Sequence, residues 1–516
     1  MLESESLLSR IRRSCRHYGS RPCVLTDQQV LTHREVWDIS TEVASSLAAL
    51  GLTKGDRIAL YAPNGAEFVV LYLAIIRIGA VVVPINLLIN TPEICHILGD
   101  AGVSCILAYE TFIPKINSAI QELVGPVPHV LGFGSGLTIR QSLADLVGNG
   151  AEFKEPSINP VQDLLAILYT SGTTGFPKGA MLTHDNLACN TESVHQAMRW
   201  ESGRDRVLVV LPMFHAFATT VGLLTPLING SAIVPLAKFD PDHVAGTIRQ
   251  HEVTIFLGVP SMFGVLLRLA TSRDGDLSSL RFAISGGAAL PVSVLEKFEE
   301  KFKVRIYEGD GPTECSPVTC VNPIGGVRKP GTVGLPVPGV EMKILDDAGL
   351  PCALGEVGEI AVRGRNVMKG YWNRPEETAE VLVDGWFLSG DLGFEDQEGY
   401  FSIIDRKKDL ILVNGMNVYP RMVEEVLLAH PLILDVAVVG EPDERHGEVP
   451  VAFIVLKSSS KVTPRELRDH CRDRLGRHQI PKRMEFIEAL PRNASGKVMK
   501  RELRRSGEIE RGIRSI

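Results

Sequence analysis

Short apolar runs alternate with helical patterns through the first 325 residues. Between residues 161 and 325 we expect strands near 207–211, 231–236, 254–259, 280–285 and 304–308, with helices between them. The first 160 residues alternate in the same way. This order is typical of parallel sheets that are covered by helices. Ligands bind beyond the carboxyl ends of the strands in such sheets, so the segments that follow strands are the first candidates for a site.

The length and composition of the chain set broad limits on its class. A chain of 516 residues exceeds one ordinary hydrophobic core, so we expect two to four folding units. Apolar residues make up 45% and charged residues 22%, a balance typical of soluble globular proteins. The net charge of −7 argues against a general nucleic-acid binder. Nine cysteines without paired metal-ligand spacing favour free thiols in a reducing compartment.

Neither a signal peptide nor a membrane span is expected. The N-terminus lacks a basic segment followed by an apolar core. The longest apolar stretch, residues 68–89, is interrupted by Arg77, Gly79 and Pro84, which favours a core helix and a strand. We therefore expect a cytoplasmic protein. The sequence leaves open loose contact with a membrane surface and a homodimer.

The segment after the apolar run 164–168 carries the strongest chemical signal. It reads Tyr-Thr-Ser-Gly-Thr-Thr-Gly-Phe-Pro-Lys-Gly over residues 169–179, which we call the phosphate loop. Its backbone N–H groups, its hydroxyls and Lys178 can together bind a polyanion. A P-loop is excluded, because Pro177 precedes Lys178 and Gly179 follows it, where a P-loop needs glycine and then a hydroxyl residue. A polar surface loop is the alternative, which the neighbouring buried strand disfavours.

The phosphate loop resembles the signature of the adenylate-forming (ANL) superfamily, which includes acyl-CoA synthetases, firefly-type luciferases and adenylation domains of peptide synthetases. The resemblance implies nucleotide contacts from Thr170, Ser171, Gly172, Thr173, Thr174, Gly175 and Lys178. It also implies an α/β fold: a large N-terminal domain of helix-covered mixed and parallel sheets, a small β-barrel-like subdomain and a small mobile α+β C-terminal domain. The expected boundaries are residues 1–405, with the β-subdomain at about 326–405, a hinge at 406–408 and a lid domain at 409–516.

The segment after the strand near 207–211 is predicted to line the carboxylate pocket. In the superfamily an aromatic-histidine pair follows this strand, and Phe214 and His215 match it. A core histidine is the alternative for His215, and we favour the site. The neighbouring side chains are apolar, which favours an acyl or aryl tail over the ammonium group of an amino acid. The predicted pocket residues are Phe214, His215, Phe217, Val221 and Gly258.

Segments after two later strands are predicted to contact the nucleotide. Glycines let a flat base approach the backbone closely, as expected of the segment that follows the strand near 280–285. In the segment after the strand near 304–308, the resemblance assigns the α-phosphate to Thr313. It assigns Mg²⁺, a cation that prefers oxygen ligands, to Glu314. The remaining predicted nucleotide contacts in these segments are Gly286, Gly287, Ala288, Glu308, Gly309 and Asp310.

Asp310 departs from the family pattern. The family usually has an aromatic residue between these two glycines, stacked near the adenine. Stacking of a base on an aromatic ring contributes about 1–3 kcal/mol, so the departure predicts weaker ATP binding or a compensating contact. Our hypothesis is that Asp310 accepts a hydrogen bond from the adenine amino group.

Four motifs near the C-terminus complete the resemblance. Asp391 ends a Ser-Gly-Asp motif whose aspartate accepts both ribose hydroxyls, as a carboxylate can. Residues 400–409 resemble the hinge, although a solvated basic turn is the alternative. The resemblance there places Ile403 and Arg406 beside the nucleotide and makes Lys408 the pivot. It also assigns Gly415 to the pantetheine tunnel of CoA and makes Lys497 the catalytic lysine.

These motifs occur in family order and imply a two-step reaction. A carboxylate attacks the α-phosphorus of ATP, pyrophosphate leaves, and the acyl-adenylate then passes its acyl group to the thiol of CoA. ATP, Mg²⁺ and CoA are implied, with Lys497, Glu314, Thr170 and Lys178 as catalytic residues. An acyl-CoA synthetase for an apolar, fatty carboxylate is the leading interpretation. The alternatives are an adenylating enzyme that loads an acyl- or peptidyl-carrier protein in trans, a luciferase-like oxygenase and a non-catalytic nucleotide binder.

Overall fold

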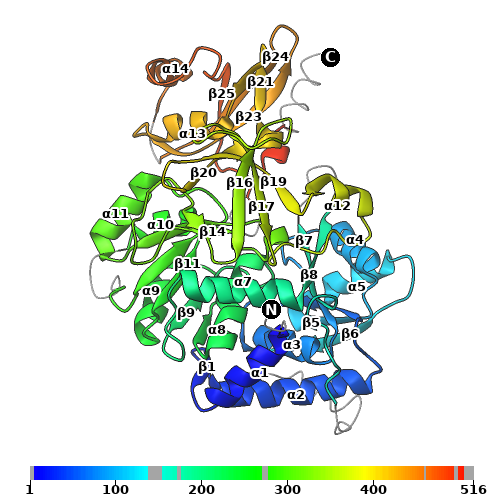
Figure 1. Cartoon of the computed structure of the whole chain (residues 1–516). Coiled ribbons are helices and arrows are strands. Elements are labelled where there is room, and N and C mark those ends of the chain that lie inside the picture. Colours follow the sequence, from blue (N-terminus) through cyan, green and yellow to red (C-terminus); the bar gives the residue numbers. More distant parts are fainter. Residues whose placement is uncertain are drawn as a thin grey trace. The chain divides into compact units, whose positions relative to one another are not determined.

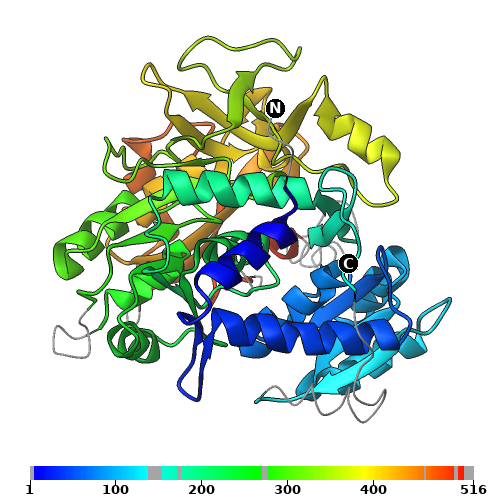
Figure 2. The ribbon, with the colours of Figure 1, turned by 60° about the horizontal axis from the view of Figure 1, so that its bottom comes forward.

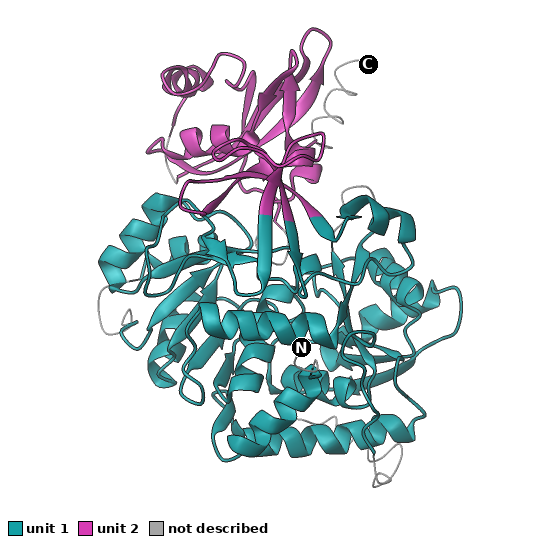
Figure 3. Ribbon diagram, in the orientation of Figure 1, with its two compact units in different colours: residues 1–342, 362–387 teal, residues 343–361, 388–516 magenta. Residues whose placement is uncertain are grey.

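The structure, a computed structural model, describes residues 5–136, 154–170, 176–269, 277–457, 461–492 and 498–504. The chain divides into two compact units (Figure 3). The first unit comprises residues 1–342 and 362–387, and the second comprises residues 343–361 and 388–516. The division groups part of the predicted β-subdomain with the C-terminal residues. The predicted domain boundaries and the hinge at 406–408 remain predictions.

A nine-stranded sheet is the larger sheet of the first unit, in the order β15-β14-β13-β12-β11-β9-β10-β1-β2. Strands β1 (Pro22–Leu25), β10 (Ala232–Pro235), β9 (Arg206–Val209), β11 (Ile255–Gly258), β12 (Phe282–Ser285) and β13 (Ile306–Asp310) run parallel. Strands β2 (Val30–Thr32), β14 (Cys320–Val321) and β15 (Leu335–Pro336) are antiparallel at the two edges. Each of the five strands predicted between residues 207 and 308 overlaps an observed one.

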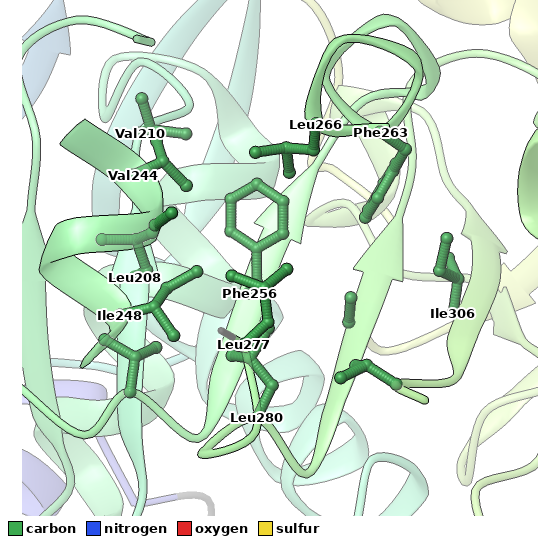
Figure 4. Packing of buried hydrophobic residues seen from close by; sticks show 14 of the residues in the cluster. Leu208, Val210, Val244, Ile248, Phe256, Phe263, Leu266, Leu277, Leu280 and Ile306 are labelled. Atoms are coloured by element: carbon green, nitrogen blue, oxygen red, sulfur yellow. The ribbon is translucent and has the colours of Figure 1, made fainter. Parts of the chain in front are cut away.

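Helices cover this sheet on both faces. One face packs against α9 (Pro241–Gln250), α10 (Pro260–Leu266) and α11 (Val292–Phe302). Figure 4 shows this cluster around Phe256 of β11, with Leu208 of β9 and Ile306 of β13. Alternate strand residues point to the other face. There Gly222 of the π-helix η2 (Ala218–Leu224) lies against Val209 and Leu257.

The first unit also contains a six-stranded sheet, in the order β6-β5-β3-β4-β7-β8. Strands β5, β6, β7 and β8 are labelled in Figure 1. Strands β3 (Arg57–Tyr61), β4 (Val81–Pro84), β5 (Cys105–Tyr109), β6 (His129–Phe133) and β7 (Leu164–Thr170) are parallel, and β8 (Lys178–Thr183) is antiparallel to β7. The phosphate loop therefore connects two paired strands. Helices α4 (Thr91–Ala101) and α5 (Ile113–Gln121) contribute to the core against this sheet.

Several helices of the first unit, namely α1 (Leu7–His17), α2 (His33–Ala49), α4, α7 (His184–Ala197) and α9, begin at residues with side-chain caps. Asn90 accepts from the backbone N–H of Glu93 in a capping box that starts α4, and Gly102 ends the helix in the left-handed conformation. Thr32 and Glu35 form the same box at α2. Helices α1 and α2 are visible side by side in Figure 2. The other helices of this unit are α3 (Ala66–Arg77), α8 (Thr225–Asn229) and α12 (Pro375–Val381).

Short strands with glycine turns follow, as the sequence predicts. Strands β16 (Val340–Leu345), β17 (Gly358–Gly364), β19 (Trp386–Glu395) and β18 (Leu382–Val383) pair in that order, and β20 (Phe401–Arg406) pairs with β19. The C-terminal part has a second sheet, ordered β22-β21-β24-β23 with β25 on β24. Its elements are β21 (Ile411–Val413), β22 (Met416–Val418), α13 (Pro420–Leu428), β23 (Ile433–Asp443), β24 (Gly447–Leu456), α14 (Pro464–Arg472) and β25 (Arg483–Phe486).

No helix in the described parts of the chain combines the length and the apolar character needed to cross a membrane.

Candidate active site

Predicted pocket residues lie at the carboxyl ends of neighbouring parallel strands. Gly258 ends β11 and lies in register with Ser285 at the end of β12, which in turn pairs with Glu308 of β13. A Cβ atom at Gly286 would lie 3.1 Å from Cε1 of Phe217. The structure therefore brings Phe217 and Gly286 into contact, from segments that follow two different strands.

The segment after β9 contains both buried residues, Met213 and Ala216, and partly exposed ones. Phe214, His215 and Phe217 are each partly exposed. The backbone N–H of Phe217 donates to Nδ1 of His215 over 3.4 Å, which orients the imidazole along the segment. Val221 on η2 is fully buried. The assignment of all four to a carboxylate pocket remains a prediction.

The Gly-Asp-Gly segment at the end of β13 is held against residues 317–320. A Cβ atom at Gly311 would lie 1.5 Å from the carbonyl oxygen of Pro317, so only glycine fits there. The carbonyl oxygen of Asp310 accepts from the backbone N–H and from Oγ1 of Thr319, both over 3.0 Å. Buried Glu308 accepts from the N–H of Leu290 over 2.9 Å. That bond ties the segment after β12 to the end of β13.

Glu314 lies beside Tyr371, which belongs to none of the motifs recognised in the sequence. The hydroxyl of Tyr371 donates to Oε1 of Glu314 over 2.8 Å. Burial raises the pKa of Tyr371, and the Glu314 carboxylate raises it further, so the phenol keeps its proton. Residues 369–372 pair with β8, through hydrogen bonds from Met181 to Gly370 and from Trp372 to Gly179. That pairing is what places Tyr371 next to the phosphate loop.

Lys178 and Thr170 lie in the same cluster. Nζ of Lys178 forms an ion pair with Glu377 of α12 and lies 5.2 Å from the centroid of the Tyr371 ring. Oγ1 of Thr170 donates to the carbonyl oxygen of Lys178 over 3.5 Å. The structure thus brings Lys178 and Glu314 to Tyr371, and Thr170 pairs with Lys178 across β7 and β8. Glu377 was missed as well, because its contact with Lys178 joins segments far apart in the sequence.

Some predicted residues lie outside the part of the chain that the structure describes. These are Ser171, Gly172, Thr173, Thr174, Gly175 and Lys497. Gly287 and Ala288 are described and exposed, and Thr313 starts the short helix η4 (Thr313–Cys315) that also carries Glu314. The roles of all these residues in binding remain predictions.

The second unit brings two predicted ribose contacts together. Nε of Arg406 lies 3.2 Å from Oδ1 of Asp391, and the two residues pair directly across β19 and β20. Ile403 pairs with Gly393 on the same strands. Glu359 supports this arrangement, because it accepts from the N–H of Gly390 over 3.0 Å and from Nζ of Lys407 over 2.9 Å. Glu359 belongs to none of the motifs recognised in the sequence.

The residues predicted as hinge and tunnel are both exposed. Lys408 lies in the single turn η5 (Lys407–Asp409). Asn414 and Gly415 have φ values of +52° and +76° and form the two-residue turn between β21 and β22. Asn-Gly is the favoured pair for such a turn. The left-handed backbone therefore already accounts for glycine at position 415, and its contact with CoA remains a prediction.

The acidic residues fit a cation that arrives with the nucleotide. No group of three metal-ligating side chains exists among the residues for which the structure gives positions. Glu314 can supply one carboxylate, and Mg²⁺ is commonly held by one or two carboxylates together with substrate phosphates. Glu314 therefore fits the role of a ligand to the Mg²⁺ that enters with ATP better than the role of a ligand in a permanent metal site.

The site combines glycine-rich segments at the ends of parallel strands with the side chains of Lys178 and Glu314. This combination defines an α/β enzyme that binds a nucleotide. Residues 11–372 match the model of the AMP-binding enzyme family, and residues 422–497 match the C-terminal domain of the same enzymes. The chain belongs to the AMP-binding enzyme family, in its acyl-CoA synthetase branch. The predicted superfamily and the predicted α/β fold are thereby confirmed.

Similar proteins cover nearly the whole chain. A long-chain-fatty-acid–CoA ligase of Bacillus subtilis (strain 168) is 37% identical over 97% of this chain and 94% of its own length. A feruloyl-CoA synthase of an Amycolatopsis species is 37% identical over 92% of this chain and 94% of its own. ATP-bound MatB from Rhodopseudomonas palustris superposes with a TM-score of 0.90 at 31% identity, over 97% and 98% of the chains. The anthranilate CoA ligase AuaEII in complex with anthranoyl-AMP superposes equally well at 28% identity, over 98% of both chains.

Proposed function

We propose that the protein is an ATP-dependent acid–thiol ligase that activates an apolar, fatty carboxylate as acyl-AMP and transfers the acyl group to CoA. The observation that carries the proposal is the cluster of Lys178, Tyr371 and Glu314 at the base of the phosphate loop. It joins a cation that can offset phosphate charge to a carboxylate that can bind the Mg²⁺ of Mg·ATP, with a neutral donor that orients the carboxylate. The similarity to fatty-acid–CoA ligases over nearly the full chain supports the choice of reaction.

The first step is the attack of a carboxylate oxygen on the α-phosphorus of Mg·ATP, with pyrophosphate as the leaving group. Lys178, which forms an ion pair with Glu377, offsets negative charge on the phosphates. Glu314 holds the Mg²⁺ that enters with ATP, and Tyr371 orients the Glu314 carboxylate. Fixed charges and dipoles of this kind supply much of the acceleration in phosphoryl-type transfer.

The second step is the attack of the CoA thiol on the acyl-adenylate, with AMP as the leaving group. We assign Lys497 to the first step alone and Gly415 to the second. The C-terminal domain would exchange these two residues at the nucleotide by rotation about Lys408. Asp391 and Arg406, which already pair with each other, would hold the ribose in both steps.

An apolar acid is favoured by the residues after β9. Phe214 and Phe217 flank His215, and neither this segment nor Gly258 provides a carboxylate for an amino group. An aryl acid is the second candidate, favoured by two partly exposed aromatic rings and by the similarity to a feruloyl-CoA synthase.

A panel of carboxylates tests the proposal. Fatty acids of graded length, ferulate and anthranilate are compared by AMP release with and without CoA. We expect the highest kcat/KM for a fatty acid and a strong dependence on CoA. The best rate on ferulate would favour the aryl candidate. If acyl-AMP forms but does not react with CoA, the acceptor would be a carrier-protein thiol. Failure of every acid in the panel to support ATP–pyrophosphate exchange would contradict the proposed function.

A further inference from the structure

Helix α4 contacts both ends of the phosphate loop. His96 and Asp100 are four residues apart, so they lie on the same side of the helix, one turn from each other. His96 contacts Phe176 and Pro177 at the end of the loop, and Asp100 contacts Tyr169 at its beginning. The buried residues of α4, such as Ile97, pack into the core of the six-stranded sheet.

His96 makes two contacts with the end of the loop. Its ring stacks on the ring of Phe176 with centroids 4.5 Å apart and planes 18° apart. Its Nε2 lies 3.2 Å from the carbonyl oxygen of Pro177, to which an Nε2–H donates. The Phe176 side chain is otherwise largely exposed, at 56% of its full accessibility. The exposed ring of Phe176 therefore makes its aromatic contact with α4.

Asp100 binds the beginning of the loop and also the segment that carries Tyr371. Its Oδ2 accepts from the hydroxyl of Tyr169 over 2.7 Å. Burial and this hydrogen bond raise the pKa of Tyr169, so the donor keeps its proton. The backbone carbonyl of Asp100 accepts from Nε1 of Trp372 over 2.9 Å. Its Oδ1 lies 3.4 Å from Nη2 of Arg374.

The contacts of Asp100 lead on to Lys178. Nε of Arg374 lies 3.4 Å from Oε1 of Glu377, and Glu377 forms the ion pair with Lys178. Asp100, Arg374, Glu377 and Lys178 therefore form a chain of alternating charges from α4 to the lysine. None of the first three was predicted from the sequence.

We propose that His96 and Asp100 are positioning residues that hold the two ends of the phosphate loop, and Lys178 with them, in the arrangement that binds the triphosphate of ATP. The inference rests on the proposed function of the site. Side chains that are held in place before a ligand arrives lose less conformational entropy when they bind it. Donors that are already in place also stabilise developing charge most effectively.

Four variants of the full-length protein test the proposal. His96→Ala removes both contacts at the end of the loop, and His96→Phe can keep the stacked ring while it loses the hydrogen bond. Asp100→Asn weakens the bond to Tyr169 and the ion pair with Arg374. Ile97→Val is the matched control, because it weakens the packing of the same helix without touching the loop. The dissociation constant of Mg·ATP is measured by calorimetry, and each variant is also unfolded in urea.

We expect His96→Ala and Asp100→Asn to raise the dissociation constant of ATP about tenfold, the usual consequence of one lost hydrogen bond in a polar site. The KM for ATP in ATP–pyrophosphate exchange should rise in parallel, with the KM for the carboxylate unchanged. His96→Phe should recover part of the loss. Ile97→Val should lower the urea midpoint and leave ATP binding within twofold of the wild type.

Wild-type ATP affinity in folded His96→Ala and Asp100→Asn would overturn the proposal, as would an equal loss in Ile97→Val. The calorimetric measurement needs no carboxylate. If the wild type binds ATP but exchanges pyrophosphate with no acid, the proposed function fails while the positioning role is still tested.

Discussion

The Tyr371 hydroxyl and the Glu314 carboxylate are joined by a hydrogen bond of 2.8 Å. The same tyrosine ring lies beside Nζ of Lys178, so one side chain links the acidic and basic parts of the site. Because the carboxylate is oriented by a neutral donor, it keeps its full negative charge for a cation. An ionised partner would have cancelled part of that charge.

Tyr371→Phe should weaken the use of Mg·ATP. The variant keeps the ring over Lys178 and loses only the hydrogen bond to Glu314, so we expect kcat/KM for ATP to fall by about tenfold, with a higher Mg²⁺ requirement. ATP–pyrophosphate exchange measured across Mg²⁺ concentrations checks this. Tyr72→Phe is the control, because the buried Tyr72 hydroxyl has no hydrogen-bond partner in the described structure. An unchanged Mg²⁺ dependence in Tyr371→Phe would contradict the assignment.

Gly311→Ala should destabilise the first unit. The new Cβ would lie 1.5 Å from the Pro317 carbonyl oxygen, so the backbone must move, and we expect a loss of about 1–3 kcal/mol or more in the free energy of unfolding. Gly246→Ala in α9 is the matched control. Nothing lies within 4 Å of its Cβ position, and alanine should stabilise the helix by about 0.5–1 kcal/mol. Urea unfolding separates the two; equal effects would refute the steric argument.

Lys497→Ala should separate the two half-reactions. We expect adenylate formation to fall by at least a hundredfold, because the lysine offsets charge as the α-phosphorus is attacked. Thioester formation from supplied acyl-AMP and CoA should stay within a few-fold of the wild type. Quenched-flow measurement of each half-reaction checks this, with Lys461→Ala, an exposed lysine in the same unit, as control. A normal overall rate in Lys497→Ala would rule out the role.

Asp310→Ala should change the choice of nucleotide. If Asp310 accepts a hydrogen bond from the adenine amino group, its loss should raise the KM for ATP several-fold and leave that for GTP unaffected, since guanine has no such group at that position. Exchange assays with both nucleotides measure the ratio. An unaltered ATP/GTP ratio in the variant would contradict the hypothesis that Asp310 compensates for the missing aromatic ring.

His184 should make stability fall in mild acid. Burial lowers its pKa from 6.5 to about 4, so the unfolded chain binds the proton more readily than the folded chain does between these values. The stabilisation is complete above pH 6.5 and is lost as the pH falls towards 4, by up to about 3 kcal/mol. Urea unfolding between pH 7 and 4 measures this slope. His184→Gln should flatten it, and an identical slope in the variant would refute the assignment.

The parallel strands could be predicted, because a strand buried on both faces is a short continuous apolar run. Residues 231–236 and 254–259 were recognised in this way and correspond to β10 and β11. The glycine-rich segment with Lys178 was recognised by local chemistry, since the donors it offers are adjacent in the chain. Gly415 was recognised as well, but a two-residue turn with positive φ explains it without any ligand.

The sequence by itself determined the succession of strands and helices along the chain, the phosphate loop and the chemistry of the family, because these depend on residues that are neighbours in the chain. Only the tertiary structure decided which side chains surround that loop. Tyr371 reaches Glu314 through the pairing of residues 369–372 with β8, and His96 and Asp100 reach the loop through the packing of α4. Such contacts join segments that are distant in sequence, and no local pattern specifies which long-range pairing buries the most apolar surface and satisfies the most hydrogen bonds.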